Sequence, residues 1–333
     1  MRERGSPMLD EAFVQAPRGP RLGPVERLLF LRRIPEFGSL RVADLAFLGE
    51  NLREHFTPRG GVLLRAGERV AAMHVLLEGR VRVRRHGREL GIAERGAVLG
   101  SALLLARDED GLEAVAEDDT ATLALDRESL LDALEERFGI FRSALRGVAR
   151  ELVELLAEHP AEAAPEAVPA TLPGFTDGEI DLAERILLLR SRPPFQACSI
   201  DAIAELAQST EEVRFPDGHA LWRAGDRAVQ TLFLVRGAVR CAPPGCRAPF
   251  RVGAGQSLGA LEVLADVPRW YDAVVEEPVL ALQGELEHVL DVLEDNVDMG
   301  VEFLSFLARS SVRVRERIAE RAGSLPELLD CRT

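Results

Sequence analysis

The chain has 333 residues, enough for two domains of ordinary size, each with its own hydrophobic core. Its formal net charge of -14 argues against a general nucleic-acid-binding protein, because a polyanion would be repelled over most of the surface. All 41 basic residues are arginine, which excludes mechanisms that need a lysine, such as a Walker P-loop or a Schiff base. We find no apolar run of membrane-spanning length and no signal peptide, and therefore expect a cytoplasmic protein without membrane insertion.

Residues 1–23 are polar and interrupted by Pro and Gly, which predicts a disordered N-terminal tail. Residues 24–157 follow the order helix, many short strands, helix. Within the strands, apolar and polar residues alternate, so that Val81 and Val83 are expected to face inward while Arg80, Arg82 and Arg84 face outward. Residues 129–156 then have helical periodicity, with this apolar face: Leu130, Leu134, Phe138, Phe141, Leu145, Val148 and Leu152.

Residues 158–174 contain four prolines, which exclude a continuous helix and predict a linker. The sequence TDGE at 176–179 is typical of a capping box, so a helix is expected to begin there. Residues 175–325 then form the predicted second domain, and 326–333 a C-terminal tail. The heavy use of Ala, Arg, Leu and Gly without Lys suggests a bacterial, GC-rich genome.

The two predicted domains are copies of one another. The tripeptide RAG begins at Arg65 and again at Arg223, 158 residues later. The segments VLLEGRVRV and FLVRGAVRC, at 75–83 and 233–241, have the same spacing. Gly100 and Gly259 are 159 residues apart, so one residue is inserted between the two regions of the repeat. Two copies joined by a linker explain this pattern better than a solenoid, which needs more copies and a shorter period.

These residues carry a family resemblance. IPEF at 34–37, the RAGE turn, the VLLEGRVRV strand pair and the Gly-x-x-x-Gly before a short helix resemble the cyclic nucleotide-binding domain. The whole chain is similar to a tandem pair of such domains, as in the regulatory subunit of protein kinase A. The resemblance implies a mainly β fold with flanking helices: two tandem jelly rolls, each a double-stranded β-helix.

The resemblance also implies a phosphate-binding cassette of the form F-G-E-x-A-L-L-x-x-x-P-R-x-A. Backbone N–H groups at the start of its short helix and the arginine bind the cyclic phosphate, and the glutamate binds the ribose hydroxyl. In the second copy, the candidate ligand-binding residues are Gly259, Ala260, Leu261 and Arg269. The glutamate is replaced by Ala260, which should weaken sugar recognition roughly tenfold to a hundredfold.

The first copy has lost both specificity residues. Its cassette begins Gly100, Ser101, and Asp110 stands at the position of the arginine. A carboxylate there would repel a phosphate, so this site is predicted to be inactive for a cyclic nucleotide.

Other features admit two interpretations each. Arg269 either binds a phosphate or is a solvated arginine stacked beside Trp270, and the structural role is slightly favoured. Trp270 and Tyr271 are more typical of a hydrophobic rim than of base stacking. Cys241 and Cys246 flank a tight turn; in a reducing compartment we expect free thiols, although their redox state stays open.

The arginine-rich strand at 80–88 is more typical of a solvated face than of a docking site for an acidic partner. The last predicted helix carries an apolar stripe, which fits equally well a helix packed on its own barrel or the seam of a homodimer. The stripe comprises Leu304, Leu307, Ala308, Ser311, Val314 and Ile318. Only GSLPELLDCRT follows this helix, too short for the DNA-binding domain of the catabolite activator family.

The sequence therefore predicts a non-enzymatic regulatory protein with no metal and no resident cofactor. In one version, the second copy senses cyclic AMP, cyclic GMP or another phosphate anion and controls a partner protein of unknown identity. In the other, both pockets are vestigial and the chain is a ligand-free scaffold.

Overall fold

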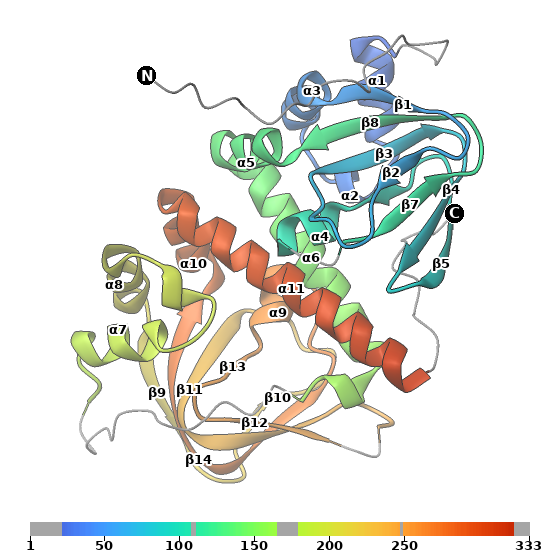
Figure 1. Cartoon of the computed structure of the whole chain (residues 1–333). Helices are drawn as coiled ribbons and strands as arrows, with labels where there is room; N and C mark the ends of the chain where they lie inside the picture. The colour runs from blue at the N-terminus through green and yellow to red at the C-terminus, as the bar shows by residue number, and fades with distance from the viewer. Residues whose placement is uncertain (1–21, 108–110, 165–178, 247–248, 323–333) are drawn as a thin grey trace, which may run out of the picture.

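The computed structural model describes residues 22–107, 111–164, 179–246 and 249–322 (Figure 1). Each half of the chain forms a β barrel with helices before and after it, as the repeat predicts. The fold is therefore mainly β with flanking helices. The predicted N-terminal and C-terminal tails and most of the linker lie outside the described residues.

The first barrel follows three short helices, α1 (Pro24–Leu31), α2 (Pro35–Gly38) and α3 (Val42–Asn51). Its two four-stranded sheets have the orders β1-β8-β3-β6 and β2-β7-β4-β5. The strands are β1 (Arg53–Thr57), β2 (Val62–Leu64), β3 (Ala72–Glu78), β4 (Val81–Arg85), β5 (Arg88–Ala93), β6 (Val98–Leu99), β7 (Glu113–Ala116) and β8 (Thr120–Asp126). A short helix, α4 (Ser101–Ala106), joins β6 to β7.

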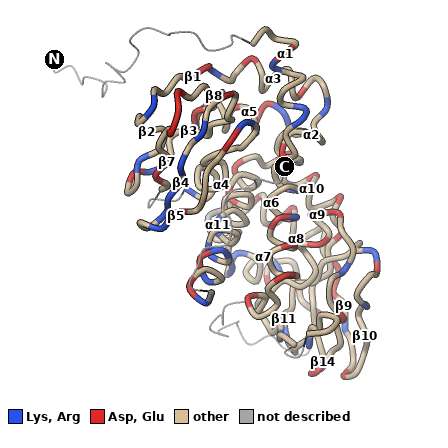
Figure 2. The backbone as a smooth tube through the Cα atoms, turned by 90° about the vertical axis from the view of Figure 1, so that its right-hand side faces the viewer, with Lys and Arg blue, Asp and Glu red and all other residues tan. Residues whose placement is uncertain are grey.

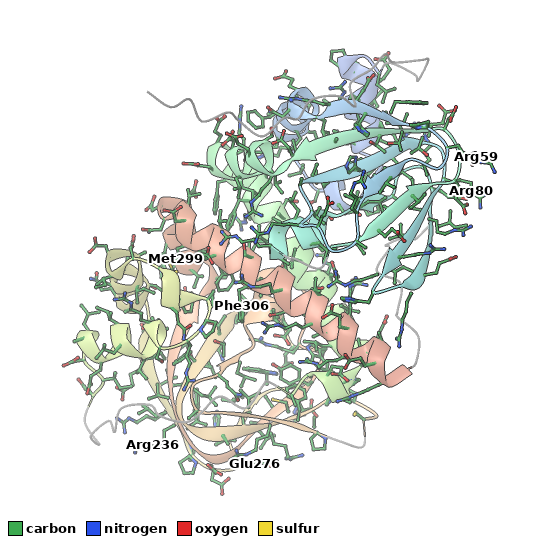
Figure 3. The ribbon with its side chains drawn as sticks, in the orientation of Figure 1. Arg59, Arg80, Arg236, Glu276, Met299 and Phe306 are labelled. Atoms are coloured by element: carbon green, nitrogen blue, oxygen red, sulfur yellow. The ribbon has the colours of Figure 1, made fainter. Side chains whose placement is uncertain are left out.

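The predicted inward and outward residues of β4 are confirmed. Val81 and Val83 are buried, while Arg82 and Arg84 are partly exposed on the other face. Figure 3 shows Arg80 at the outer edge of this barrel. The cause is the two-residue repeat of a strand, which places alternate side chains on opposite faces of a sheet.

The helical character expected over 129–156 is confirmed, but the segment is divided into α5 (Arg127–Glu136) and α6 (Phe138–Glu158). Arg137 between them has φ -133° and ψ 85°, outside the helical region. The break allows α5 to stay on the first barrel while α6 extends toward the second (Figure 1). Periodicity alone does not detect it, because the apolar residues of both segments remain on one face of a continuous projection.

The first described helix of the second half is α7 (Leu182–Arg190), whose capping box is formed by Asp181 and Glu184. Of the TDGE capping box expected from the sequence, Thr176 to Gly178 lie outside the described residues, and Glu179 precedes α7 without being part of it. A 3-10 turn, η2 (Phe195–Ala197), and α8 (Ile200–Gln208) follow. The closing helices are α10 (Leu286–Asp295) and α11 (Val297–Ala322).

The second barrel contains the same strands, with two of them fused across both sheets. Its path is β10-β14-β11-β12, with β9 paired to β14 and β13 to β11. The strands are β9 (Glu211–Phe215), β10 (Ala220–Trp222), β11 (Gln230–Ala242), β12 (Phe250–Gly253), β13 (Ser257–Leu258) and β14 (Asp272–Glu285). The cassette helix is α9 (Ala260–Ala265).

Gly79 and Gly237, which are equivalent in the repeat, mark the bend between the two sheets. Both have positive φ, +97° and +85°. A Cβ atom at Gly79 would lie 2.8 Å from the carbonyl oxygen of Asp119, and one at Gly237 would lie 2.3 Å from that of Pro278. Only glycine fits this backbone conformation and this close approach of two segments of the chain.

The two halves are joined along α6 and α11, which pack against each other (Figure 1). Helix α11 also contacts α4 of the first half, and α6 contacts α9 of the second. Figure 3 shows Met299 and Phe306 along α11 between the barrels. One cluster of buried apolar residues runs through both halves. No helix among the described residues has the length and apolar character needed to cross a membrane.

Candidate functional site

The cassette of the second half has the predicted strand-turn-helix form. Gly259 has φ +79° between β13 and α9, and the α9 backbone begins at Ala260. A Cβ atom at position 259 would lie 2.4 Å from the Arg269 guanidinium and 3.0 Å from Trp222. The structure therefore brings Gly259, Ala260 and Arg269 together, and glycine is required because the arginine lies against the turn.

The expected solvated arginine beside Trp270 is wrong, because the Arg269 side chain is buried, stacks on Trp222 and is bound by the protein itself. The residue is 3% exposed. Its guanidinium donates to the carbonyl oxygens of Gly259 at 2.7 Å and Gln230 at 2.6 Å, and lies 4.0 Å from the Trp222 ring centroid. It also pairs with the Glu262 carboxylate at 3.3 Å. An anion in this cassette would find the guanidinium already surrounded by acceptors.

Glu262 is the residue that sequence reasoning undervalued. It stands at a position where the family cassette has a small residue, and it is 2% exposed. Besides Arg269, Trp270 and Tyr271 also hydrogen-bond to its carboxylate. Burial raises the pKa of Glu262, an effect that Arg269 opposes, and burial beside this carboxylate raises the pKa of Tyr271. The signal was available: an acidic residue seven positions before the only cassette arginine.

The interior of the second barrel is filled by apolar side chains. They form a cluster separate from the core shared by the two halves. Phe250 contacts both Trp270 and Tyr271, with ring centroids 5.6 and 5.2 Å apart. The hydrophobic contact expected of these residues is present, but Tyr271 is buried in the interior cluster, whereas Trp270 is partly buried beside it. The buried members are Trp222, Leu232, Leu234, Val239, Cys241, Val252, Leu258, Tyr271, Ala273, Val275, Val279 and Ala281.

The first barrel differs from the second in its cassette and in its interior. Gly100 keeps its left-handed conformation, φ +83°, and Ser101 begins α4, but Asp110 lies outside the described residues. A cavity of about 160 Å³ opens beside this turn. It is lined by Val62, Leu63, Leu64, Arg65, Glu68, Arg69, Val70, Ala71, Ala72 and His74. Sequence reasoning missed this cavity, since it looked only for the cassette.

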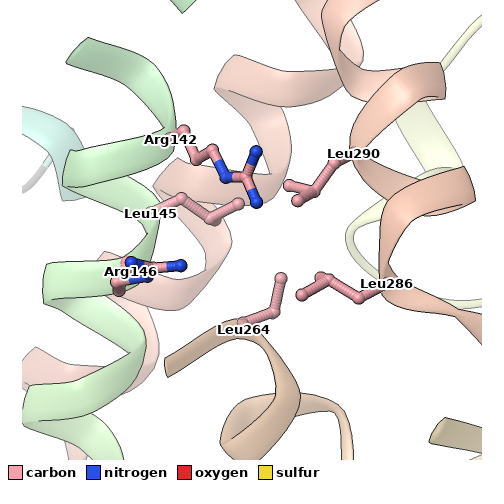
Figure 4. A pocket seen from close by; sticks show the side chains of 6 residues that line it. All are labelled: Arg142, Leu145, Arg146, Leu264, Leu286 and Leu290. Carbon is pink, nitrogen blue, oxygen red and sulfur yellow. The ribbon is translucent and has the colours of Figure 1, made fainter. Parts of the chain in front are cut away.

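The centre of the seam between the halves leaves no ligand-sized space among the described residues. The cavity there has a volume of about 10 Å³, which is room for no more than about one water molecule. Figure 4 shows Arg142, Leu145 and Arg146 on one side and Leu264, Leu286 and Leu290 on the other.

The arginines of β4 lie in a network of ion pairs. Arg82 pairs with Glu117 and Glu89, and Arg84 with Glu89 and Glu113. Acidic and basic residues are interspersed over these strands (Figure 2). The solvated-face interpretation therefore holds for Arg82 and Arg84, whereas Arg85 of the same strand is buried and pairs with Glu316 of α11.

The apolar stripe of the last helix is buried inside the chain. Val314 and Ile318 cluster with Leu152 and Leu155 of α6. The Glu151 carboxylate of α6 accepts hydrogen bonds from Ser311 and Arg315 of α11. The stripe thus packs on the other half of the same chain, and a homodimer through it would first require α6 and α11 to separate.

The cysteines and the metal-binding groups add no chemistry in the part of the chain that the structure describes. Cys198, Cys241 and Cys246 are not in disulfides, and burial raises the pKa of Cys241. Cys331 lies outside the described residues. Within the described ranges, no three His, Cys, Asp or Glu side chains are grouped so that they would hold a metal ion.

Residues 54–137 match the family model of the cyclic nucleotide-binding domain. No curated protein sequence matches the chain. Among solved structures, the chain is similar to the regulatory domain of Toxoplasma gondii PKA crystallised with cAMP: 15% identity, 86% of this chain and 96% of that one, TM-score 0.32.

Two further structures are similar. The regulatory subunit of a cAMP-independent protein kinase A from Trypanosoma brucei has 15% identity, 89% coverage of each chain and a TM-score of 0.33. A cyclic nucleotide-binding-like protein from Brucella abortus has 22% identity over 33% of this chain and 98% of its own, with a TM-score of 0.30. None of these likenesses bears on what the chain binds. Its first barrel matches the cyclic nucleotide-binding domain family, and its second barrel repeats the same strand and helix order.

Proposed function

We propose that the chain is a non-enzymatic regulatory protein that acts through a protein partner, and that its second barrel holds its shape without a cyclic nucleotide. The observation that carries this proposal is the Arg269–Glu262 pair. The carboxylate lies 3.3 Å from the guanidinium that the family cassette uses for phosphate, and both residues are buried. Glu262 thus supplies from within the chain the negative charge that a ligand would otherwise bring.

A bound phosphate would have to displace this carboxylate. The displaced Glu262 would remain buried without its ion-pair partner, and breaking a buried ion pair in this way costs about 3–5 kcal/mol. That cost exceeds the about 1.5–3 kcal/mol expected from a charge-assisted hydrogen bond to the ligand. The filled barrel adds a second obstacle, since the ligand's sugar and base would also compete with the aromatic cluster.

The sensor remains the second candidate, and one observation favours it. The indole N–H of Trp222, stacked under Arg269, is buried with no acceptor among the described residues. An anion held by the α9 backbone at Ala260 and Leu261 and by Arg269 would provide that acceptor. Binding would then act through α10 and α11 on the partner protein.

Thermal unfolding of the full chain with millimolar cyclic AMP, cyclic GMP or inorganic phosphate distinguishes the two candidates. A ligand that binds only the folded state at a hundred times its Kd adds about 2.7 kcal/mol of stability, which is readily measured. We expect no shift of the midpoint with any of the three. A rise that disappears in Arg269→Ala would establish the sensor and overturn the ligand-independent second barrel.

A further inference from the structure

Four polar side chains form a connected row inside the first barrel. The Nδ1 atom of His74 lies 3.1 Å from the Thr122 hydroxyl, and that of His55 lies 3.3 Å from the Thr57 hydroxyl. The two imidazole rings meet edge to face, with centroids 5.6 Å apart. His74 is only 6% exposed and also lines the 160 Å³ cavity. His74 therefore connects the row to that cavity.

The second barrel shows that the fold does not need this row. The strand registers pair His55 with Thr122 and Thr57 with Thr120 in the first half, and Val213 with Ala281 and Phe215 with Val279 in the second. At the position of His74, the second half has Leu232. Every member of the row thus has an apolar counterpart.

The cavity also follows from a residue that differs between the two barrels. Leu64, which lines the cavity, is equivalent to Trp222, whose ring fills that part of the second barrel. Burying polar groups costs stability unless they are hydrogen-bonded, whereas apolar residues at these positions would be stabilising. A polar row beside an unfilled space is therefore the arrangement of a binding site and not of a structural core.

The charge state of the two histidines and the volume of the cavity limit which ligands it can bind. Burial and the neighbouring His55 lower the pKa of His74 to about 4, and burial lowers that of His55, so both rings are neutral at pH 7. Neutral imidazoles donate or accept hydrogen bonds but do not neutralise an anion in the interior. A dry cavity of about 150 Å³ is known to hold benzene, so about 160 Å³ suits one ring and is too small for a whole nucleotide.

We propose that the first barrel binds an uncharged single-ring molecule with a hydrogen-bonding substituent, with its ring between Leu64, Val70 and Ala72 and its polar atom on His74. This site is independent of whether the second barrel takes a ligand. At its mouth, Arg65 and Arg69 are exposed on either side of Glu68, so charged groups lie only at the entrance.

The six histidines of the chain provide the assay. In the full chain labelled with ¹³C at histidine Cε1, phenol and cytosine are titrated separately and the six resonances are followed, each assigned by substitution. We expect saturable shifts of the His74 and His55 resonances with at least one probe, and none at His159, His219 or His288.

Three variants and two charged probes make the result decisive. His74→Leu and Leu64→Trp copy the second barrel, and each should weaken binding of the probe at least about tenfold. Binding to the Leu64→Trp variant is followed at the His55 and His74 resonances. The control, His288→Leu on the exposed face of α10, should not weaken binding. The proposal is overturned if neither uncharged probe shifts His74. It is also overturned if benzoate binds in place of phenol, which would assign the site to the mouth arginines, or if cyclic AMP shifts His74, which would make this a nucleotide pocket.

Discussion

At the scale of single residues, the second barrel depends on a buried ion pair. Arg269 is held by Glu262, two carbonyl oxygens and the Trp222 ring. We expect Arg269→Ala to destabilise the chain by about 3–5 kcal/mol, because Glu262 is then left as an uncompensated buried charge. Arg251→Ala is the matched control: Arg251 pairs with Glu276 and Glu277 on the exposed face, so its loss should cost about 1 kcal/mol or less.

Urea unfolding of both variants measures the difference. The double variant Arg269→Met, Glu262→Leu should recover most of the lost stability, since a well-packed apolar replacement of a buried pair is often neutral. Equal destabilisation by Arg269→Ala and Arg251→Ala would show that the pair is solvated and that the cassette is open.

The histidine row predicts a stability change with pH. The pKa of His74 lies near 4 in the folded chain, against an ordinary value near 6.5. The unfolded state therefore binds more protons between these values, so the stability falls as the pH decreases from about 6.5 to about 4. The loss attributable to His74 should reach about 3 kcal/mol.

His74→Leu should flatten this slope, whereas His288→Leu should leave it unchanged. Denaturant unfolding of the three chains at several pH values between 4 and 7 gives the slopes directly. An unchanged slope in His74→Leu would mean that His74 is protonated in the folded chain, contrary to its buried position beside His55.

Residue roles were only partly predictable from the sequence. The repeat located Gly259 and Arg269, and the structure brings them together. It did not reveal that Glu262 reaches Arg269, because a helix turn and a loop must first bring residues seven positions apart into contact. His55, Thr57, His74 and Thr122 are separated by up to 67 residues, and only the pairing of β1, β3 and β8 brings them together.

At the scale of elements, the backbone bend at Gly79 takes the chain from β3 in one sheet to β4 in the other. Alanine there needs a positive φ and brings its Cβ against Asp119 and Thr120. We expect Gly79→Ala to cost more than Gly87→Ala. Gly87 also has positive φ, +74°, but a methyl group at this position would have no atom of the described residues within 4 Å, so only the backbone cost of about 1–2 kcal/mol applies.

Thermal or urea unfolding of the two variants provides this comparison. Equal costs would show that the approach of β3 to β8 relaxes around a methyl group, and that only the backbone conformation requires glycine at the bend.

The helices illustrate why element boundaries are harder to predict than elements. The apolar periodicity of 129–156 is real, but the chain breaks at Arg137 because α6 must leave the first barrel to meet α9 and α11. Likewise, the stripe on α11 was identified from its spacing, but its partner was not. Its buried face packs on α6 of the same chain.

At the scale of the whole molecule, the shared core predicts that the two halves unfold together. One apolar cluster includes residues of both barrels and of the helices between them. Ion pairs also cross the seam, including Arg85 with Glu316 and Arg107 with Glu302. The two tryptophans, Trp222 and Trp270, both lie in the second half.

Tryptophan fluorescence therefore reports only the second half, whereas far-UV circular dichroism reports the whole chain. We expect coincident midpoints in urea, as for a single cooperative transition. Separate midpoints would show that the seam contributes little, and that the halves behave as independent domains joined by the linker.

The sequence by itself determined the mainly β class, the duplication and the positions of both cassettes. Strand alternation and glycine spacing depend only on residues close together in the chain, and both patterns occur once in each half. Tertiary structure alone decided that an apolar cluster including Trp222 packs in the second barrel, whereas a cavity of about 160 Å³ lies beside Leu64 and His74 in the first. The reason is physical: filling depends on side chains from strands far apart in the chain, and their volumes and polarities become comparable only when those strands face one another across the barrel.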